Sequence, residues 1–228
     1  MKFLSPWVLS LIIGLTASFA ALAKDDFPEV TEDGLLRVAD TKFSLVYAKA
    51  GVDLSVYDKV LLLDATIAFK KNWQRDQNRS YSFKVSARDM DRIRANLAEL
   101  FNQVFTEKLT EAGYALVTET GEDVLLVRPA IVNLDVLAPD TRSTGRGYQL
   151  TESAGEMTLY VELYDSVTSD ILVKAMDRAA DRNRGSFHWQ TQGSNRVAAR
   201  KILNSWADTL VNALNDAHAA ASHSENEE

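Results

Sequence analysis

Two stretches of the chain place apolar residues at the three- and four-residue spacing of an amphipathic helix. The first follows Ser86, with Asp89 three residues later as in a capping box, and ends before Gly113. Its apolar stripe comprises Met90, Ile93, Leu97, Leu100, Phe101, Val104, Phe105 and Leu109. The second follows Ser194, and its stripe comprises Ala199, Ile202, Leu203, Trp206, Leu210, Ala213 and Leu214. A single apolar face on each helix predicts that each packs against one surface.

The other apolar segments have the alternation or the short β-branched runs of strands. The clearest is Met157 to Tyr164, which a turn over 165–170 joins to a return strand over 171–180. Further strands are predicted over 43–48, 59–69, 114–117 and 124–137. Pro129 has no N–H to donate, so we expect an edge, a bulge or a break in the last of these. Loops are predicted over 70–84, 139–154 and 182–193.

This order of elements predicts an α+β fold. Strands that follow one another in sequence usually pair, so we expect a mostly antiparallel sheet of about five or six strands. The two amphipathic helices would pack on one face of that sheet. The predicted segments are a signal peptide over 1–23, an acidic extended lead-in over 24–42, a single α+β domain over 43–218, and an acidic disordered tail over 219–228.

The first residues have the three parts of a cleavable export signal. Lys2 precedes an apolar run that begins at Trp7, and small residues then lead to Ala21-Leu22-Ala23. The alternative is an uncleaved membrane anchor, because residues 3–23 are almost long enough to span a bilayer. We expect cleavage after Ala23, a periplasmic location, and a mature chain without a transmembrane segment.

The composition narrows the classes of function. The chain has 25 Lys and Arg against 32 Asp and Glu, a formal net charge of −7, and no cysteine. An acidic chain disfavours nucleic-acid binding, which needs a basic surface. The lack of cysteine excludes disulfides, thiol nucleophiles, and metal centres ligated by cysteine. It also excludes a lipid anchor of the bacterial lipoprotein kind, and we expect no cofactor.

The residues that usually carry catalysis form no recognisable pattern. His188 is the one plausible catalytic base among three histidines, and the neighbouring Ser186 lacks the third member of a triad. We expect no metal site, because histidine ligands are too few. Asp64 and Asp135 lie inside apolar strands, where a carboxyl group can serve as an acid, but the alternation favours a position on the solvated face for each. The glycines of 144–147 lack the spacing of a phosphate loop.

One segment departs from the acidic average. Residues 70–94 contain eight Lys or Arg and three Asp, a net charge of +5. Arginine beside exposed aromatic side chains is common in recognition surfaces. The residues predicted to bind a partner, either an envelope protein or an anionic envelope component, are Trp73, Arg75, Arg79, Arg182, Arg184 and Trp189. The alternative is an ordinary solvated charged loop.

Two short motifs resemble a known family. They are Val52–Val60 (VDLSVYDKV) and Leu159–Thr168 (LYVELYDSVT), the second being an apolar strand that ends in an Asp-x-x-Thr turn. Both are similar to a bacterial family known as the domain of unknown function DUF3313, over most of the mature chain. The resemblance implies an exported envelope protein without an established activity or catalytic residues. Many members look like lipoproteins, and this chain departs from them by lacking cysteine.

Three functions of different classes stay open at this point. The leading one is a non-enzymatic accessory protein of the periplasm or envelope that binds a partner. The second is a hydrolase of an envelope polymer, which a close pair of carboxylates such as Asp64 and Asp135 would favour. The third is a small-ligand binder with an apolar pocket between sheet and helices, lined by Phe101, Phe105 and Trp206.

Overall fold

The computed structural model describes the backbone of residues 27–80, 84–136, 149–151, 153–182, 188–190 and 192–225. The predicted export signal, Arg184, Ser186 and the glycines of 144–147 lie outside these residues. For Arg182, and for His188 and Trp189, the backbone is described but the side chain is not.

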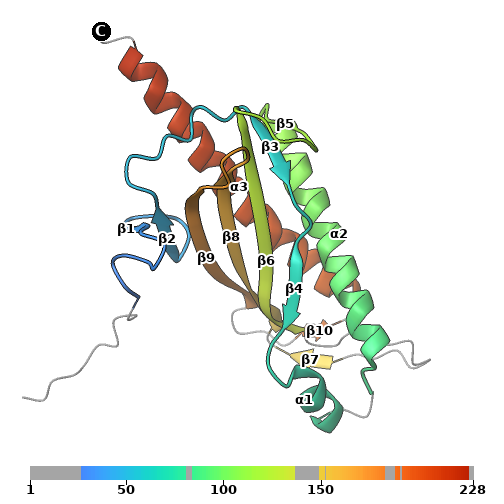
Figure 1. The fold of residues 1–228 in the computed structure, drawn as a ribbon. Coiled ribbons are helices and arrows are strands. Elements are labelled where there is room, and N and C mark those ends of the chain that lie inside the picture. The colour runs from blue at the N-terminus through green and yellow to red at the C-terminus, as the bar shows by residue number, and fades with distance from the viewer. Residues whose placement is uncertain are drawn as a thin grey trace, which may run out of the picture.

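An eight-stranded mixed sheet forms the body of the protein (Figure 1). Its order is β1-β2-β9-β8-β6-β3-β5, and β4 also pairs with β6. The strands are β1 (Leu36–Val38), β2 (Leu45–Ala48), β3 (Lys59–Leu62), β4 (Thr66–Phe69), β5 (Ala115–Leu116), β6 (Val124–Val136), β8 (Ser153–Asp165) and β9 (Ile171–Arg182). β7 (Gln149–Thr151) and β10 (His188–Gln190) form a separate antiparallel pair. The α+β class is confirmed, but the sheet is larger than predicted, and β3 pairs in parallel with both β5 and β6.

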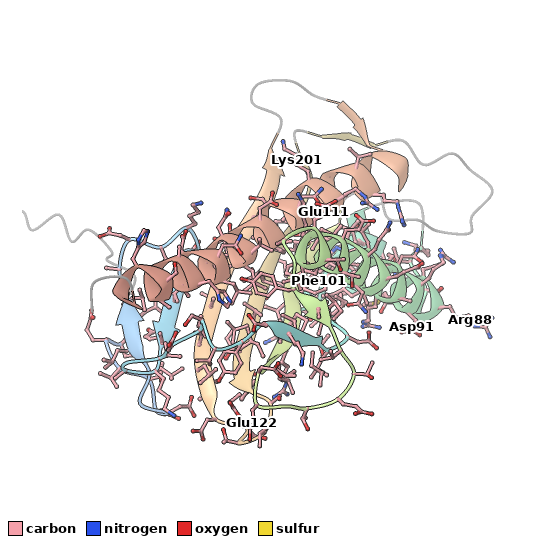
Figure 2. The ribbon with its side chains drawn as sticks, turned by 90° about the horizontal axis from the view of Figure 1, so that it is seen from above. Arg88, Asp91, Phe101, Glu111, Glu122 and Lys201 are labelled. Atoms are coloured by element: carbon pink, nitrogen blue, oxygen red, sulfur yellow. The ribbon has the colours of Figure 1, made fainter. Side chains whose placement is uncertain are left out.

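Two long helices cover one face of the sheet. They are α2 (Ala87–Glu111) and α3 (Gln192–Glu225), and Figure 2 shows both on the same side of the strands. The predicted capping box is present, because the Ser86 hydroxyl accepts the N–H of Asp89 and the Asp89 carboxylate accepts the N–H of Ser86. The largest fully buried side chains between the layers are Phe101, Phe105, Leu109, Leu125, Ile131, Leu159, Leu203 and Leu214. None of the helices in the described part of the chain has the length and apolar character needed to cross a membrane.

A third helix, α1 (Trp73–Ser80), occupies most of the segment predicted as a loop over 70–84. Its sequence, WQRDQNRS, has Trp73 as its one apolar residue, so hydrophobic spacing could not reveal it. Trp73 and Gln77, one turn apart, are buried. The helix is therefore held by a tryptophan and a polar side chain on its inner face and not by an apolar stripe.

Pro129 interrupts the strand beside it and not its own. β6 runs without a break through Pro129, which lies opposite Val161 of β8. On the other side of β6, β3 ends at Leu62 and β4 begins at Thr66. Pro129 lacks the N–H that a continuous neighbour would need there. The predicted single strand over 59–69 is therefore two strands, and β6 is central and not an edge.

The predicted lead-in over 24–42 is part of the fold from residue 27 onward. Its Leu35 packs with Leu45 and Tyr47 of β2, and all three are less than a tenth exposed. The Tyr47 hydroxyl donates a hydrogen bond to the Pro28 carbonyl, at 2.7 Å. This small second core covers part of the sheet face that the long helices leave free.

The elements at the chain's end are longer than predicted. β8 begins at Ser153 and β9 continues to Arg182, so parts of the predicted loops over 139–154 and 182–193 are strands. α3 starts at Gln192, two residues before the predicted cap, and continues to Glu225 through most of the predicted disordered tail. An alanine-rich sequence is compatible with a helix as well as with disorder, and this explains why the tail was wrongly predicted to be disordered.

Candidate functional site

The two predicted basic segments leave the sheet at the same end. Phe69 of β4 lies opposite Leu134 of β6, Val136 lies opposite Gly155 of β8, and Gly155 lies opposite Asp181 of β9. β4 and β9 therefore end at the same end of the sheet, separated by β6 and β8, about three strand spacings or roughly 14 Å apart. Figure 1 shows α1 and the β7–β10 pair at this end of the molecule.

α1 is fixed to the sheet by its inner face. The ring of Trp73 stacks on Phe69 with centroids 4.4 Å apart, and Trp73 is 4% exposed. Gln74 Nε2 and Asn78 Nδ2 donate to the Val85 carbonyl at 2.9 and 3.1 Å, and the Val85 N–H donates to Asn78 Oδ1 at 2.6 Å. The prediction that Trp73 belongs to an exposed recognition surface is wrong, because its ring is buried as the anchor of α1.

The outer side of α1 presents the predicted arginines. Arg75 and Arg79 are one helical turn apart and exposed, and Arg75 Nε donates to Asp76 at 3.1 Å. Arg79, Lys71 and Arg88 are exposed and make no ion pair with any residue that the structure describes. Figure 2 shows Arg88 projecting outward from the first turn of α2. We call Lys71, Arg75, Arg79 and Arg88 the basic end.

Other cations of the same segment are paired internally. Arg92 contacts Asp89 at 2.9 Å, and Arg94 contacts Asp91 at 2.7 Å while its guanidinium lies 5.3 Å from the Phe69 ring centroid. The net charge of residues 70–94 therefore overstates the positive charge that is available to a partner. The exposed charge is concentrated on the basic end.

A row of alternating charges ties four strands together on the sheet face opposite the long helices. Lys70 Nζ lies 3.1 Å from Asp135 of β6 and 4.0 Å from Glu156 of β8, and Arg178 of β9 lies 2.5 Å from Glu156. The hydrogen bond from Lys70 to Asp135 raises the pKa of that lysine. Asp135 is thus an ion-pair partner for Lys70. The row of ion pairs links the strands at the end of the sheet that carries α1.

The two carboxylates proposed for hydrolysis are held apart from each other. Asp64 is exposed and accepts a hydrogen bond from Asn102 Nδ2 of α2 at 2.5 Å, on the helix side of the sheet. Asp135 contacts Lys70 on the opposite side. Within the described residues they do not form the close pair that the hydrolase hypothesis requires. No group of three or more histidine and carboxylate side chains there is placed to hold a metal ion.

The two family motifs meet at the opposite end of the sheet. The Tyr57 hydroxyl, from the first motif, donates to Asp165 Oδ2 of the second at 3.0 Å. Asp165 Oδ1 also accepts the N–H groups of Val167 and Thr168, at 3.0 and 2.7 Å. Burial, strengthened by the bond to Asp165, raises the pKa of Tyr57 to about 12, and the Thr168 N–H lowers the pKa of Asp165. The two motifs therefore form a hydrogen-bonded joint between the loop before β3 and the β8–β9 turn.

His218, near the end of the predicted domain, is part of this joint. Its Nε2 is 3.3 Å from the Tyr57 carbonyl oxygen, and its ring centroid is 5.9 Å from that of Tyr114. The Tyr114 hydroxyl donates to Asn215 of the same helix at 3.0 Å. The part of α3 just before the predicted domain end at residue 218 supplies this packing.

Sequence reasoning missed a polar network on the free sheet face. The hydroxyls of Tyr160 and Tyr164 each donate to one oxygen of Glu162, both at 2.8 Å. Arg128 lies 3.6 Å from the same carboxylate, which is 14% exposed. Burial and the bond to Glu162 raise the pKa of Tyr160. The alternation along 157–164 was the available signal, since it placed these polar residues on one face.

The cavity predicted between Phe101, Phe105 and Trp206 is filled. The two phenylalanine rings stack with centroids 3.9 Å apart and are at most 1% exposed. Trp206 is 2% exposed, and its Nε1 donates to Asp177 Oδ2 at 2.8 Å. The central part of the interface between sheet and helices is thus a packed core.

The mixed sheet with two covering helices places the protein in the α+β class. A family model described as "Protein of unknown function (DUF3313)" matches residues 30–210, and the chain belongs to that family. The resemblance of the two motifs to DUF3313 is confirmed. No curated protein matches the chain.

Several solved structures are similar to the chain at low identity. The PelC dodecamer from Paraburkholderia phytofirmans is 11% identical, with a TM-score of 0.35, over 70% of this chain and 93% of that chain. A minor lipoprotein from Acinetobacter baumannii is 10% identical, with a TM-score of 0.34, over 69% and 91%. A Xanthomonas campestris protein of family DUF330 is 11% identical, with a TM-score of 0.42, over 76% and 92%. Likenesses this weak carry no information about function.

Proposed function

We propose that the protein is exported to the periplasm and acts in the cell envelope as a non-enzymatic accessory protein that binds an anionic partner. The observation that carries this proposal is the basic end, where exposed cations lie on α1 and at the start of α2. Three of its four residues have no ion-pair partner in the described structure. The chain as a whole has a net charge of −7, so this local charge stands against the average.

The arrangement of the basic end suits recognition by charge. Arg75 and Arg79 leave the same side of a short helix that Trp73 holds against the sheet. A fixed cationic face steers and orients an anionic partner more than it raises the final affinity. In the proposal Arg182, Arg184 and Trp189 extend this face, because β9 ends and β10 lies at the same end of the sheet. Trp189 then supplies the aromatic contact that Trp73, being buried, does not.

The export signal is the second part of the proposal. Its support is the basic, apolar and small-residue order of residues 1–23, which leads to Ala21-Leu22-Ala23. The partner is then a component of the envelope, such as an acidic envelope protein or an anionic polymer.

Crosslinked capture from isolated envelopes tests the binding function. The variant Arg75→Glu with Arg79→Glu reverses the exposed charge without touching the anchor of α1. We expect wild-type protein to retain a defined set of components that this variant loses. A control variant with the same change in charge, Lys49→Glu with Lys59→Glu, alters one exposed and one half-buried lysine near the opposite end of the sheet, each paired with an aspartate. It should retain what the wild type retains.

Circular dichroism and thermal unfolding must first show that both variants fold. Exposed ion pairs contribute about 0–1 kcal/mol each, so neither variant should lose its fold. Equal retention of the same components by the wild type and both variants would mean that the basic end is ordinary solvated surface.

A further inference from the structure

A pocket of about 150 Å³ opens between α2, α3 and the ends of β6 and β8, away from the filled core. Its walls are mainly apolar and include Ile93, Leu97, Leu134, Met157 and Ile202. Asp135 and Glu156 also line it, and both carboxylates are ion-paired, Asp135 with Lys70 and Glu156 with Arg178. β6 ends and β8 begins at the sheet end that also carries α1, so the pocket and the basic end lie at the same end of the molecule.

Small residues of α3 leave this space open. Ala198 and Ala199 line the pocket, whereas further along the helix Leu203 and Trp206 fill the gap to the sheet completely. Protein interiors normally pack without voids, so a larger side chain at either alanine would be the ordinary solution here. The alanines therefore leave a space that the described residues do not fill.

The size of the pocket limits what enters it. A buried cavity of about 150 Å³ lined by aliphatic side chains stays dry and takes a ligand of benzene size. Pockets for drug-sized ligands are several times larger, roughly 300–1,000 Å³. The apolar part of an occupant is thus one short alkyl chain or a single ring.

The polar side chains at the rim of the pocket indicate the chemistry of the ligand's head group. Arg196 of α3 lines the pocket, is exposed, and has no ion pair with any described residue. Asn96 of α2 lines it from the other helix and is also exposed. A guanidinium and an amide donor at the mouth of an apolar cavity match an anionic head group on an apolar tail.

We infer that this pocket binds a small anionic amphiphile, with its alkyl tail against Ile93, Met157 and Ile202 and its head group at Arg196. A free fatty acid and a lysophospholipid both carry this chemistry. The site is separate from the basic end, because none of the four residues of that surface lines the pocket.

Methyl-detected NMR titration of the full chain with octanoate tests the inference. We expect saturable shifts confined to the methyl groups of Ile93, Met157 and Ile202. The Ala199→Leu variant should fold, because it grows into open space, and should lose these shifts. Its matched control is Ala213→Leu, which adds the same side chain at a position of α3 that is exposed, contrary to its place in the predicted apolar stripe, and should bind as the wild type does. A parallel titration with octanoyl lysophosphatidylglycerol distinguishes a fatty-acid site from a lysophospholipid site, because the ligand that suits the site should bind more tightly.

Arg196→Gln tests the head-group contact without changing the cavity. The affinity for octanoate should fall by up to about fivefold, as for an exposed ion pair, while octanol binding stays unchanged. Lys201→Gln, also an exposed cation of α3, should leave both affinities unchanged. Two results would overturn the inference: no saturable binding of either octanoyl ligand, or binding that Ala199→Leu leaves intact. Octanol binding as tight as octanoate in the wild type would overturn its anionic part.

Discussion

Single side chains join the layers of this protein by combining burial with one well-placed hydrogen bond. Trp206 fills the space between α3 and the sheet, and its indole N–H donates to Asp177 of β9. The other oxygen of Asp177 accepts the N–H of Ser44, just before β2. Trp73 is equally buried, but its Nε1 has no hydrogen-bond partner among the described residues. Two tryptophans with similar burial therefore have different consequences when they are replaced.

Placing a charged side chain in the core is the most severe test of which helix residues are buried. Leu97→Asp and Trp206→Asp each place an unpaired carboxylate at a position less than a tenth exposed, and we expect a loss of several kcal/mol in the free energy of unfolding. Val197→Asp, at a position of α3 that is 71% exposed, should change it by no more than about 0.5 kcal/mol. Chemical denaturation measures all three, and an unchanged midpoint for either core variant would mean that the helix faces are wrongly placed.

The joint between the two family motifs should respond to acid. The pKa of Asp165 is lowered in the folded state, mainly by the Thr168 N–H, so its carboxylate stabilises the fold above its unfolded pKa. That contribution is lost as the pH falls from about 5 through the lower folded pKa. Asp165→Asn keeps an acceptor for the turn but cannot titrate. Between pH 5 and pH 2, roughly the range in which an Asp carboxyl titrates, the wild type should lose more unfolding free energy than this variant; equal losses would show that Asp165 is not coupled to folding.

At the scale of elements, the sequence predicts best where local chemistry and burial agree. The α2 helix could be predicted from Ser86 to its end because the cap, the apolar stripe and Gly113 point to the same helix, and Gly113 has the positive φ of 96° that favours glycine. α1 could not, because one tryptophan and side-chain bonds to Val85 hold it. The break between β3 and β4 depends on Pro129 of another strand, which hydrophobic spacing along residues 59–69 does not record.

The anchoring of α1 can be measured directly. Trp73→Ala removes the stack on Phe69, and we expect a loss of roughly 3 kcal/mol and faster amide exchange over 73–80. Trp73→Phe keeps a ring and forfeits no hydrogen bond, so it should cost about 1 kcal/mol. Trp206→Phe should cost more than Trp73→Phe, by about 1 kcal/mol, because it leaves Asp177 without the indole donor. Unchanged exchange over 73–80 in Trp73→Ala would contradict the role of the tryptophan as anchor.

At the scale of the whole molecule, the two ends of the sheet carry different features. One end holds the family motifs, where Tyr57, Asp165 and His218 tie the loop before β3, the β8–β9 turn and α3 together. The other carries the basic end and the apolar pocket. The fold class and the basic segment were predictable from sequence, whereas the pocket was not. The pocket depends on Ala198 and Ala199 facing the ends of β6 and β8, and residues far apart in sequence create it.

The proposed place of action has a test of its own. If residues 1–23 are a cleaved export signal, intact-mass measurement of protein purified from cells will show a mature chain that starts at Lys24. Replacing Ala21 and Ala23 with leucine should block cleavage and leave the full-length mass, because the peptidase needs small side chains at these two sites. An intact Met1 on the wild-type protein would contradict export by cleavage.

The measurement that tests the central claim most directly is the salt dependence of envelope binding. Exposed charges are screened beyond about 8 Å at physiological ionic strength, so binding through the basic end must weaken as salt rises. In a co-sedimentation titration with isolated envelopes, the account predicts that wild type and Lys49→Glu with Lys59→Glu dissociate together as salt increases. Arg75→Glu with Arg79→Glu should bind weakly at every salt concentration. Binding of all three proteins that is equal and independent of salt would contradict the account.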